Sequence, residues 1–248
     1  MSTMQAFHND PKIKAKYLRR VRAHAKADEI IHGKYWEDGK GCAIGCTIHG
    51  SSHQACEDEL GIPVALAYLE DTLFEGQRNS DAKQFPVRFL SAIRVGADLS
   101  RVQFQFLHWL LTEELAGRDN PAVAAVIKEC ADAIEPGTRG LPIDLNRVKK
   151  AGEAARAARA ASAVWAVRAA ALAVEAAASA ARAVAVATVA ASAAWAALAA
   201  WAAALAVEAA AAAAVAAAVA TVAASASMAS MASYKRMADK LIELLKAA

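Results

Sequence analysis

The chain has 248 residues and a formal net charge of +3 at pH 7, from 28 Lys and Arg against 25 Asp and Glu. A balance this mild excludes the concentrated basic face of a dedicated nucleic-acid-binding protein, so we do not expect nucleic acid as a partner. Four cysteines, three of them in one short stretch, do not form the spaced disulfide framework of a small secreted protein. The length permits one large or two small domains.

The first 34 residues are an exception to the charge balance, because basic side chains outnumber acidic ones there. On a helix these charges would be spread around the cylinder, which favours a solvated helix over a phosphate-binding arm. The segment lacks the apolar core of a signal peptide, and the cysteine usage is typical of a reducing compartment. We therefore expect a cytoplasmic protein.

Helix start and stop signals follow one another through the first half of the chain. Asn9 and Asp10 are expected to cap a helix that has Pro11 in its first turn and ends at Gly33. Ser51 or Ser52 is expected to cap a short helix that stops at Gly61. The segments between these helices contain the glycine-rich residues 39–50, for which we expect a tight turn.

The same signals continue towards the middle of the chain. Further expected elements are a helix over 64–75 opened by Pro63 and ended by Gly76, a weaker segment over 86–93, a helix over 99–116 capped by Asp98, a helix from Asn120 and Pro121 to Ile134, and a loop over 135–142. No stretch shows the sustained alternation of apolar and polar residues that marks a strand. The predicted fold class is all-α, with an N-terminal helical bundle as domain 1–140.

Residues 141–248 are rich in alanine and contain two 33-residue repeats, 168–200 and 201–233. Alanine favours helix but has little side chain to bury, so such helices need a partner surface. Breaks near Ser192 and Ser225 would give a folded-back bundle of antiparallel helices. Alternatively, because 33 is three times 11, the repeat would suit one continuous helix. Either arrangement predicts a homo-oligomer or a protein partner.

Two uncharged windows, 183–207 and 209–234, are long enough to span a bilayer. They consist mostly of alanine, which contributes little to insertion, and only Glu208 separates them. We therefore do not expect a membrane as a partner, and a membrane-active protein is the last of the alternatives.

One cluster combines thiols and imidazoles: Cys42, Cys46, His49, His53 and Cys56. These ligand types suit zinc, and four of the five would complete a tetrahedral site, so zinc is the cofactor that the sequence suggests. The structural alternative is that the cysteines pack as small apolar groups and that His53 pairs with Glu57 one turn later.

A thiol-dependent enzyme is the main catalytic alternative, with Cys42 or Cys46 as nucleophile and a nearby histidine as base. The spacing resembles that of the all-α alkylhydroperoxidase-D-type proteins, although three residues rather than two separate the cysteines here. The acidic residues 57–59, Glu70, Asp71 and Glu75 offer paired carboxylates for acid/base or divalent-metal chemistry, but solvation at helix ends is the favoured interpretation.

Residues 39–50, 59–76 and 85–99 resemble an uncharacterised family of bacterial and phage proteins, over about residues 30–115 of this chain. The resemblance implies a bacterial or phage context and no catalytic residue. The leading hypothesis is a non-enzymatic interaction or scaffold protein with a metal-stabilised N-terminal domain. The rival is a metal- or thiol-dependent enzyme centred on residues 42–56.

Overall fold

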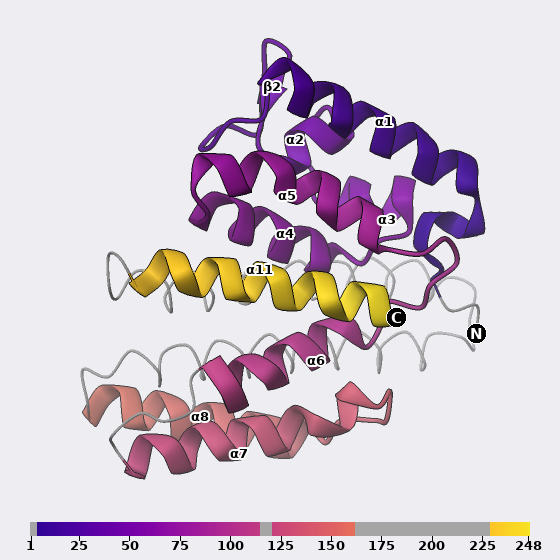
Figure 1. The fold of residues 1–248 in the computed structure, drawn as a ribbon. Coiled ribbons are helices and arrows are strands. Elements are labelled where there is room, and N and C mark those ends of the chain that lie inside the picture. Colours follow the sequence, from indigo (N-terminus) through magenta and orange to yellow (C-terminus); the bar gives the residue numbers. More distant parts are fainter. Residues whose placement is uncertain (1–3, 115–120, 162–228) are drawn as a thin grey trace. The chain divides into compact units, whose positions relative to one another are not determined.

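A computed structural model describes residues 4–114, 121–161 and 229–248, and every structural statement below concerns these residues. They are helical apart from loops and one small antiparallel ladder, which confirms the predicted all-α class (Figure 1). The chain divides into two compact units, which are described separately. Unit 1 is Met1–Phe106 together with Ala223–Ala248, and unit 2 is Leu107–Val222.

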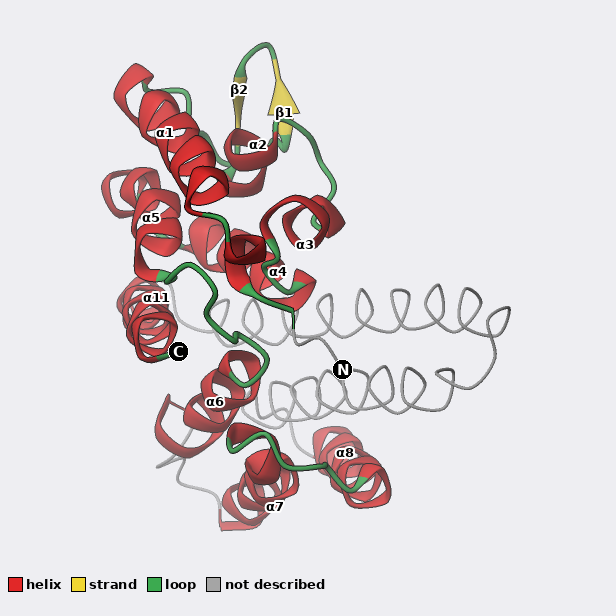
Figure 2. Cartoon of the chain, turned by 90° about the vertical axis from the view of Figure 1, so that its right-hand side faces the viewer, coloured by secondary structure: helices red, strands yellow, loops and turns green. Residues whose placement is uncertain are grey.

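Unit 1 contains most of the described elements. They are η1 (Ala6–Asn9), α1 (Pro11–Ala27), β1 (Trp36–Glu37), β2 (Lys40–Gly41), α2 (Ala43–Ile48), α3 (Gln54–Leu60), α4 (Val64–Gly76), α5 (Asn79–Ala92), the first part of α6 (Val102–Trp109) and α11 (Ala229–Ala247). Helix α4 packs against α2, α3, α5 and α11, so it lies in the interior of the unit (Figure 2). Leu66, Leu69, Leu73 and Phe74 of α4 are fully buried in the core.

Helix α1 begins as predicted and ends earlier than predicted. The Asp10 carboxylate accepts a hydrogen bond from the Lys12 amide at 2.8 Å, and Pro11 occupies the first turn. The helix ends at Asp28, which has a left-handed φ of 60°, rather than at Gly33. The reason is tertiary: the Gly41 amide donates to Glu29 O and the Ile31 amide donates to Gly41 O, which draws the chain beside β2.

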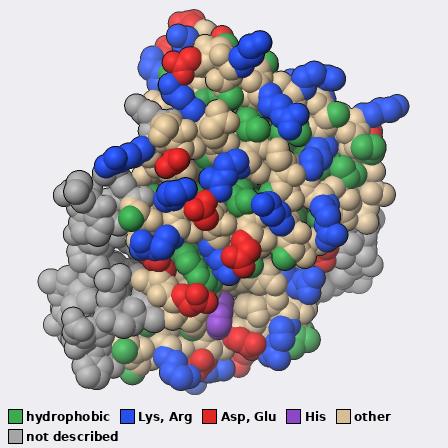
Figure 3. Space-filling model, in the orientation of Figure 1, with side chains coloured by type: hydrophobic (Ala, Val, Ile, Leu, Met, Phe, Trp, Pro, Cys, Tyr) green, Lys and Arg blue, Asp and Glu red, His purple; other side chains and the backbone are tan. Residues whose placement is uncertain are grey.

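On the face of the molecule in Figure 3, Lys and Arg side chains are scattered, and Asp and Glu side chains lie among them. Some basic side chains of α1 donate hydrogen bonds within unit 1. Lys14 Nζ donates to the Ser91 carbonyl, and Arg20 donates to the Thr47 carbonyl at 2.8 Å. These contacts support a structural role for part of the basic segment.

The glycine-rich stretch forms a helix where we expected only a turn. Cys42 caps α2, and its Sγ accepts a hydrogen bond from the Gly45 amide at 3.5 Å. A Cβ on Gly45 would lie 1.4 Å from the Tyr35 carbonyl oxygen, and one on Gly41 would lie 2.0 Å from the same atom. Glycine is therefore needed because the loop before β1 crosses directly over α2.

Two helices run through a proline. The expected segment 86–93 is the second half of α5, which has Pro86 in its interior, and α7 (Pro121–Thr138) contains Pro136 in residues expected to be a loop. An interior proline costs about 3 kcal/mol. In α5 the burial of Phe85 and Phe89 offsets this cost, since each buried aromatic side chain contributes about 1.5–3 kcal/mol.

Helix α11 belongs to unit 1, although the expected boundary near residue 140 places it in the second domain. Its apolar side chains are buried against α4 and α5, which explains the difference; they are Met237, Ala238, Leu241, Ile242 and Leu245. Arg88 Nη2 of α5 lies 2.5 Å from Asp239 Oδ1, and Arg94 Nη2 donates to the Ala248 carbonyl at 2.8 Å. Packing and ion pairing together attach α11 to α5.

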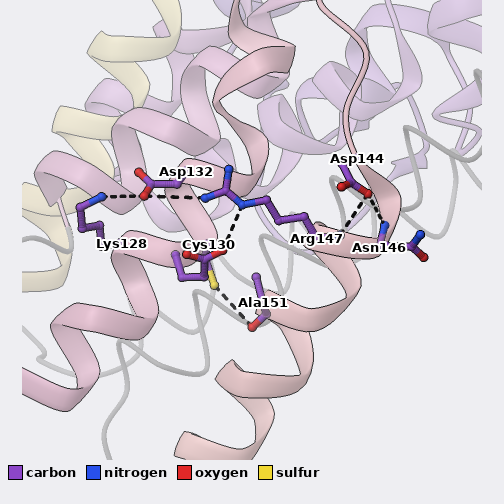
Figure 4. A network of polar contacts seen from close by, with 8 residues as sticks. Lys128, Cys130, Asp132, Asp144, Asn146, Arg147 and Ala151 are labelled. Carbon is purple, nitrogen blue, oxygen red and sulfur yellow. Dashed lines mark hydrogen bonds and ion pairs between the residues drawn. The ribbon is translucent and has the colours of Figure 1, made fainter.

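The described part of unit 2 consists of the end of α6, a π-helical turn η2 (Leu110–Glu114), α7 and α8 (Leu145–Ala161). Figure 4 shows the polar contacts that join α7 to α8. Arg147 Nε lies 3.1 Å from Glu129 Oε1, and the Cys130 thiol donates to the Ala151 carbonyl at 3.8 Å. The Asp144 carboxylate accepts from the amides of Asn146 and Arg147 at 2.9 and 3.2 Å, which caps α8.

The repeat 168–200, and most of the repeat 201–233, lie outside the described residues. The folded-back bundle and the continuous helix predicted for the alanine-rich region both concern these repeats. The window 183–207 is also outside the described residues, as is most of the window 209–234. Within the described segments, no helix combines the length and the apolar character needed to cross a bilayer.

Candidate metal centre

A thiol and two carboxylates converge between α2 and α4. The Sγ of Cys42 and one carboxylate oxygen each of Asp71 and Glu75 all lie within 4.8 Å of one another. Cys42 is buried, Asp71 is half-buried and Glu75 is exposed, so the group leads from the interior to the surface.

The backbone around the three side chains positions them. Cys42 stands at the start of α2, and Asp71 and Glu75 are four residues apart on α4, which places both carboxylates on one face of that helix. The Gly33 amide donates to both Glu75 carboxylate oxygens, at 3.0 and 3.1 Å. The carboxylate of Glu75 is therefore anchored although its side chain is exposed.

His53 holds the Asp71 carboxylate from the other side. Its Nε2 lies 3.2 Å from Asp71 Oδ2, and its ring stacks on Tyr68 with centroids 3.9 Å apart and planes 6° from parallel. The Tyr35 ring contacts the His53 ring edge-on at 5.6 Å. Asp71 Oδ1 is buried and has no hydrogen-bond partner among the described residues. A buried carboxylate oxygen without a partner costs about 1–3 kcal/mol, which a bound cation would recover.

The electrostatics around the thiol keep it protonated in the absence of a cation. Burial and then the charge of Asp71 raise the pKa of the Cys42 thiol. Burial and the neighbouring carboxylates raise the pKa of Cys56 well above its ordinary value. Burial and then the charge of Asp71 raise the pKa of Glu70 in the same way. Cys42, Cys56 and Glu70 are therefore crowded around the Asp71 carboxylate.

The five side chains of the predicted zinc cluster do not form one ligand group. Only Cys42 belongs to the three-residue group, while His53 contacts it through Asp71. The Cys46 thiol points to backbone, 3.3 Å from Gly41 O. His49 pairs with His24, and Cys56 is buried beside α4 with Glu70 as its main electrostatic neighbour.

The sequence did contain a signal for the carboxylate ligands. Asp71 and Glu75 were among the paired acidic residues, and their spacing of four residues predicts a shared helix face. We expected solvent to be their partner because they lie near the end of a helix. The packing of α2 on α4, which brings Cys42 to them, is a tertiary contact and has no local sequence signal.

A thiolate with two carboxylates suits zinc better than magnesium or calcium, which prefer oxygen ligands alone. Three protein ligands would leave the fourth tetrahedral position to water. His53 contacts Asp71 and would act as an outer residue that orients this ligating carboxylate.

Comparisons with protein-family models, curated proteins and solved structures gave no match to this chain. The resemblance of residues 30–115 to a bacterial and phage family therefore stays a prediction.

Proposed function

We propose that this chain is a zinc-stabilised helical interaction protein whose metal is held by Cys42, Asp71 and Glu75. The observation that carries the proposal is the convergence of a soft and two hard ligands on one point from two helices. The unpartnered Asp71 Oδ1 supports it, because a cation would satisfy this oxygen. Zinc would displace the thiol proton and tie the start of α2 to α4.

A non-enzymatic role is favoured over thiol catalysis by the state of the cysteines. A nucleophilic or redox-active cysteine needs a lowered thiol pKa and an accessible sulfur. Here Cys42, Cys46 and Cys56 are free thiols and all buried. Burial raises the pKa of Cys46 to about 12, and the pKa of Cys42 is also raised. Zinc coordination would use Cys42 as a thiolate without exposing it.

The test is zinc binding by calorimetry with the full chain. We expect a binding event that Cys42→Ser and Asp71→Asn each remove and that Cys46→Ser leaves intact, and any zinc bound equally by all three variants belongs to another site. Cys46 is the matched control, since it is a buried cysteine on the same helix and a member of the cluster predicted from sequence. Loss of binding in Cys46→Ser with retention in Asp71→Asn would instead support the sequence-predicted cluster.

The interaction part of the proposal rests on the alanine-rich repeats, which we infer to pack on sister chains or on another protein. Solution scattering with mass determination of the full chain tests it. A mass above that of one chain, unchanged by zinc removal, supports assembly through the repeats. A compact monomer at high concentration contradicts it.

A metal-dependent enzyme is the second candidate, favoured by one observation. Glu75 is exposed, so the fourth position of a three-ligand site would open to solvent, as in catalytic zinc sites. Replacing zinc by Co²⁺ and adding a small anion such as azide tests for that position. A change in the cobalt absorption bands indicates an open site, whereas unchanged bands indicate a closed structural site.

A further inference from the structure

A second group of side chains outside the Cys42 centre faces solvent in unit 1. His24, on the last turns of α1, and His49, which ends α2, point their rings at each other. The two Nε2 atoms are 2.8 Å apart, and the ring centroids are 5.1 Å apart with planes at 80°. Two neutral imidazoles in this arrangement share one proton, so at least one Nε2 presents a lone pair.

Glu29 determines which ring presents the lone pair. Its Oε2 lies 2.7 Å from His24 Nδ1, a contact that the tautomer with its proton on Nδ1 satisfies and that leaves Nε2 as an acceptor. A carboxylate on the far nitrogen of an imidazole is the outer contact that metal-ligating histidines usually have. It orients the ring and makes Nε2 a stronger ligand.

Trp36 of β1 fixes the second ring. The indole stacks on His49 with centroids 4.3 Å apart and planes 16° from parallel, and it meets the edge of His24 at 5.4 Å. His49 has a left-handed backbone, with φ 58° and ψ 48°, which directs its side chain back towards α1. Both rings are thus held in place while His49 is exposed to solvent.

Two charged side chains lie near the pair. The Glu29 carboxylate contacts His24 Nδ1, and Arg20 is an electrostatic neighbour of His49. The Arg20 guanidinium donates a hydrogen bond to the Thr47 carbonyl. A divalent cation at the pair would therefore meet one negative and one positive side chain at close range.

We propose that His24 and His49 form a second transition-metal site, for a zinc-class divalent cation, with Glu29 as the residue that positions His24. The cation takes the place of the shared proton between the two Nε2 atoms. The proton of His49 moves from Nε2 to Nδ1, so neither ring changes its charge. Water completes the coordination, and the two nitrogens separate to about 3.3 Å, the spacing across a tetrahedral zinc.

This site is independent of the Cys42 centre because the two share no ligand. Imidazole nitrogen suits zinc, copper and nickel, whereas magnesium and calcium require oxygen ligands. Zinc is the appropriate probe, since it does not oxidise the four free thiols.

The experiment is a zinc titration of the ¹⁵N-labelled full chain, carried out in the Asp71→Asn variant so that the Cys42 centre is disabled. The side-chain nitrogens of each histidine are followed by NMR. We expect the Nε2 signals of His24 and His49 to shift at one equivalent of zinc, while those of His8, His32 and His108 stay unchanged. Uniform shifts of all histidines, or none at one equivalent, would overturn the proposal.

Variants separate ligation from folding. His49→Gln should abolish the zinc-dependent shift of His24, and Glu29→Gln should weaken zinc binding by about 10- to 100-fold, the usual effect of losing an outer carboxylate. His108→Gln is the matched control and should bind zinc as the parent does. Circular dichroism checks that each variant is folded. These variants are made in the Asp71→Asn background, and retained zinc affinity in a folded His49→Gln variant there contradicts the site.

Discussion

Gly76, the last residue of α4, lies directly beneath the ring of Tyr234 on α11. A Cβ added at Gly76 would stand 2.1 Å from Cε1 and 2.2 Å from Cζ of that ring. Tyr234 is half-buried, and burial raises the pKa of its hydroxyl. The absence of a side chain at Gly76 is therefore what lets α11 approach the end of α4.

Gly76→Ala should lower the free energy of unfolding by on the order of 1 kcal/mol. Overpacking costs about 1–3 kcal/mol, while replacing a helical glycine returns about 0.5–1 kcal/mol. Urea denaturation measures the effect. Gly50→Ala is the control, because the nearest atom to its added Cβ would be 4.0 Å away. In the Tyr234→Ala background the Gly76→Ala change should no longer destabilise, and a cost that persists there would contradict the ring contact.

The environment of Tyr17 predicts that the free energy of unfolding falls at alkaline pH. Its side chain is buried and its hydroxyl donates a hydrogen bond to the Glu59 carboxylate. Burial, and then this hydrogen bond, raise the pKa of Tyr17 to about 12. The unfolded chain releases the proton near pH 10. The stabilisation is thus complete below about pH 10 and is lost as the pH rises towards about 12.

Tyr17→Phe isolates this contribution from the titration of the lysines. At neutral pH the variant should be less stable by about 0.5–1.5 kcal/mol, the value of one hydrogen bond. Between about pH 10 and 12 the difference should shrink, because only the parent loses the Tyr17 contribution. Denaturant midpoints measured across this range check the prediction, and a difference that stays constant with pH would count against it.

Zinc should stabilise the chain by mass action if it binds only the folded state. At a free zinc concentration 100 times Kd the gain is about 2.7 kcal/mol for one site. In the His49→Gln background, which lacks the proposed second site, Cys42→Ser should remove the remaining gain. Thermal unfolding with and without a chelator measures it. Equal thermal unfolding midpoints with and without the chelator would show that Cys42, Asp71 and Glu75 form a polar contact that binds no metal.

Asp144→Ala should destabilise α8 by about 0.5–2 kcal/mol, because the carboxylate caps the amides of Asn146 and Arg147. Asp144→Asn keeps an acceptor oxygen and should cost much less. Hydrogen exchange at the first turn of α8 reports the loss locally. Faster exchange in both variants would mean that charge, rather than the cap, protects this turn.

The helices that could be predicted from sequence are those with local signals. Asp10 and Pro11 mark the start of α1, and Pro63 and Gly76 mark the two ends of α4, by a cap and by backbone restriction alone. Helix α2 lacked such signals. Its glycine Gly45 is required because the Tyr35 carbonyl passes close to the backbone of α2. Its helicity depends on tertiary packing that composition does not reveal.

The candidate site was half predictable for the same reason. Cys42 and His53 could be singled out as residue types that bind metal, and Asp71 with Glu75 as a pair on one helix face. Proximity in sequence grouped Cys42 with Cys46 and His49, but Cys42 precedes α2, and His49 ends it in a left-handed conformation. The side chains consequently diverge, His49 towards α1 and Cys42 towards α4.

The packing of α11 on α4 and α5 also means that this part of unit 1 is completed only late in synthesis. The ribosome makes α5 long before it makes α11, so the apolar surface of α4 and α5 emerges without its cover. Closing so long a loop is entropically costly and slow. Until Tyr234 packs on Gly76, the nascent chain exposes an apolar surface of the kind that chaperones bind.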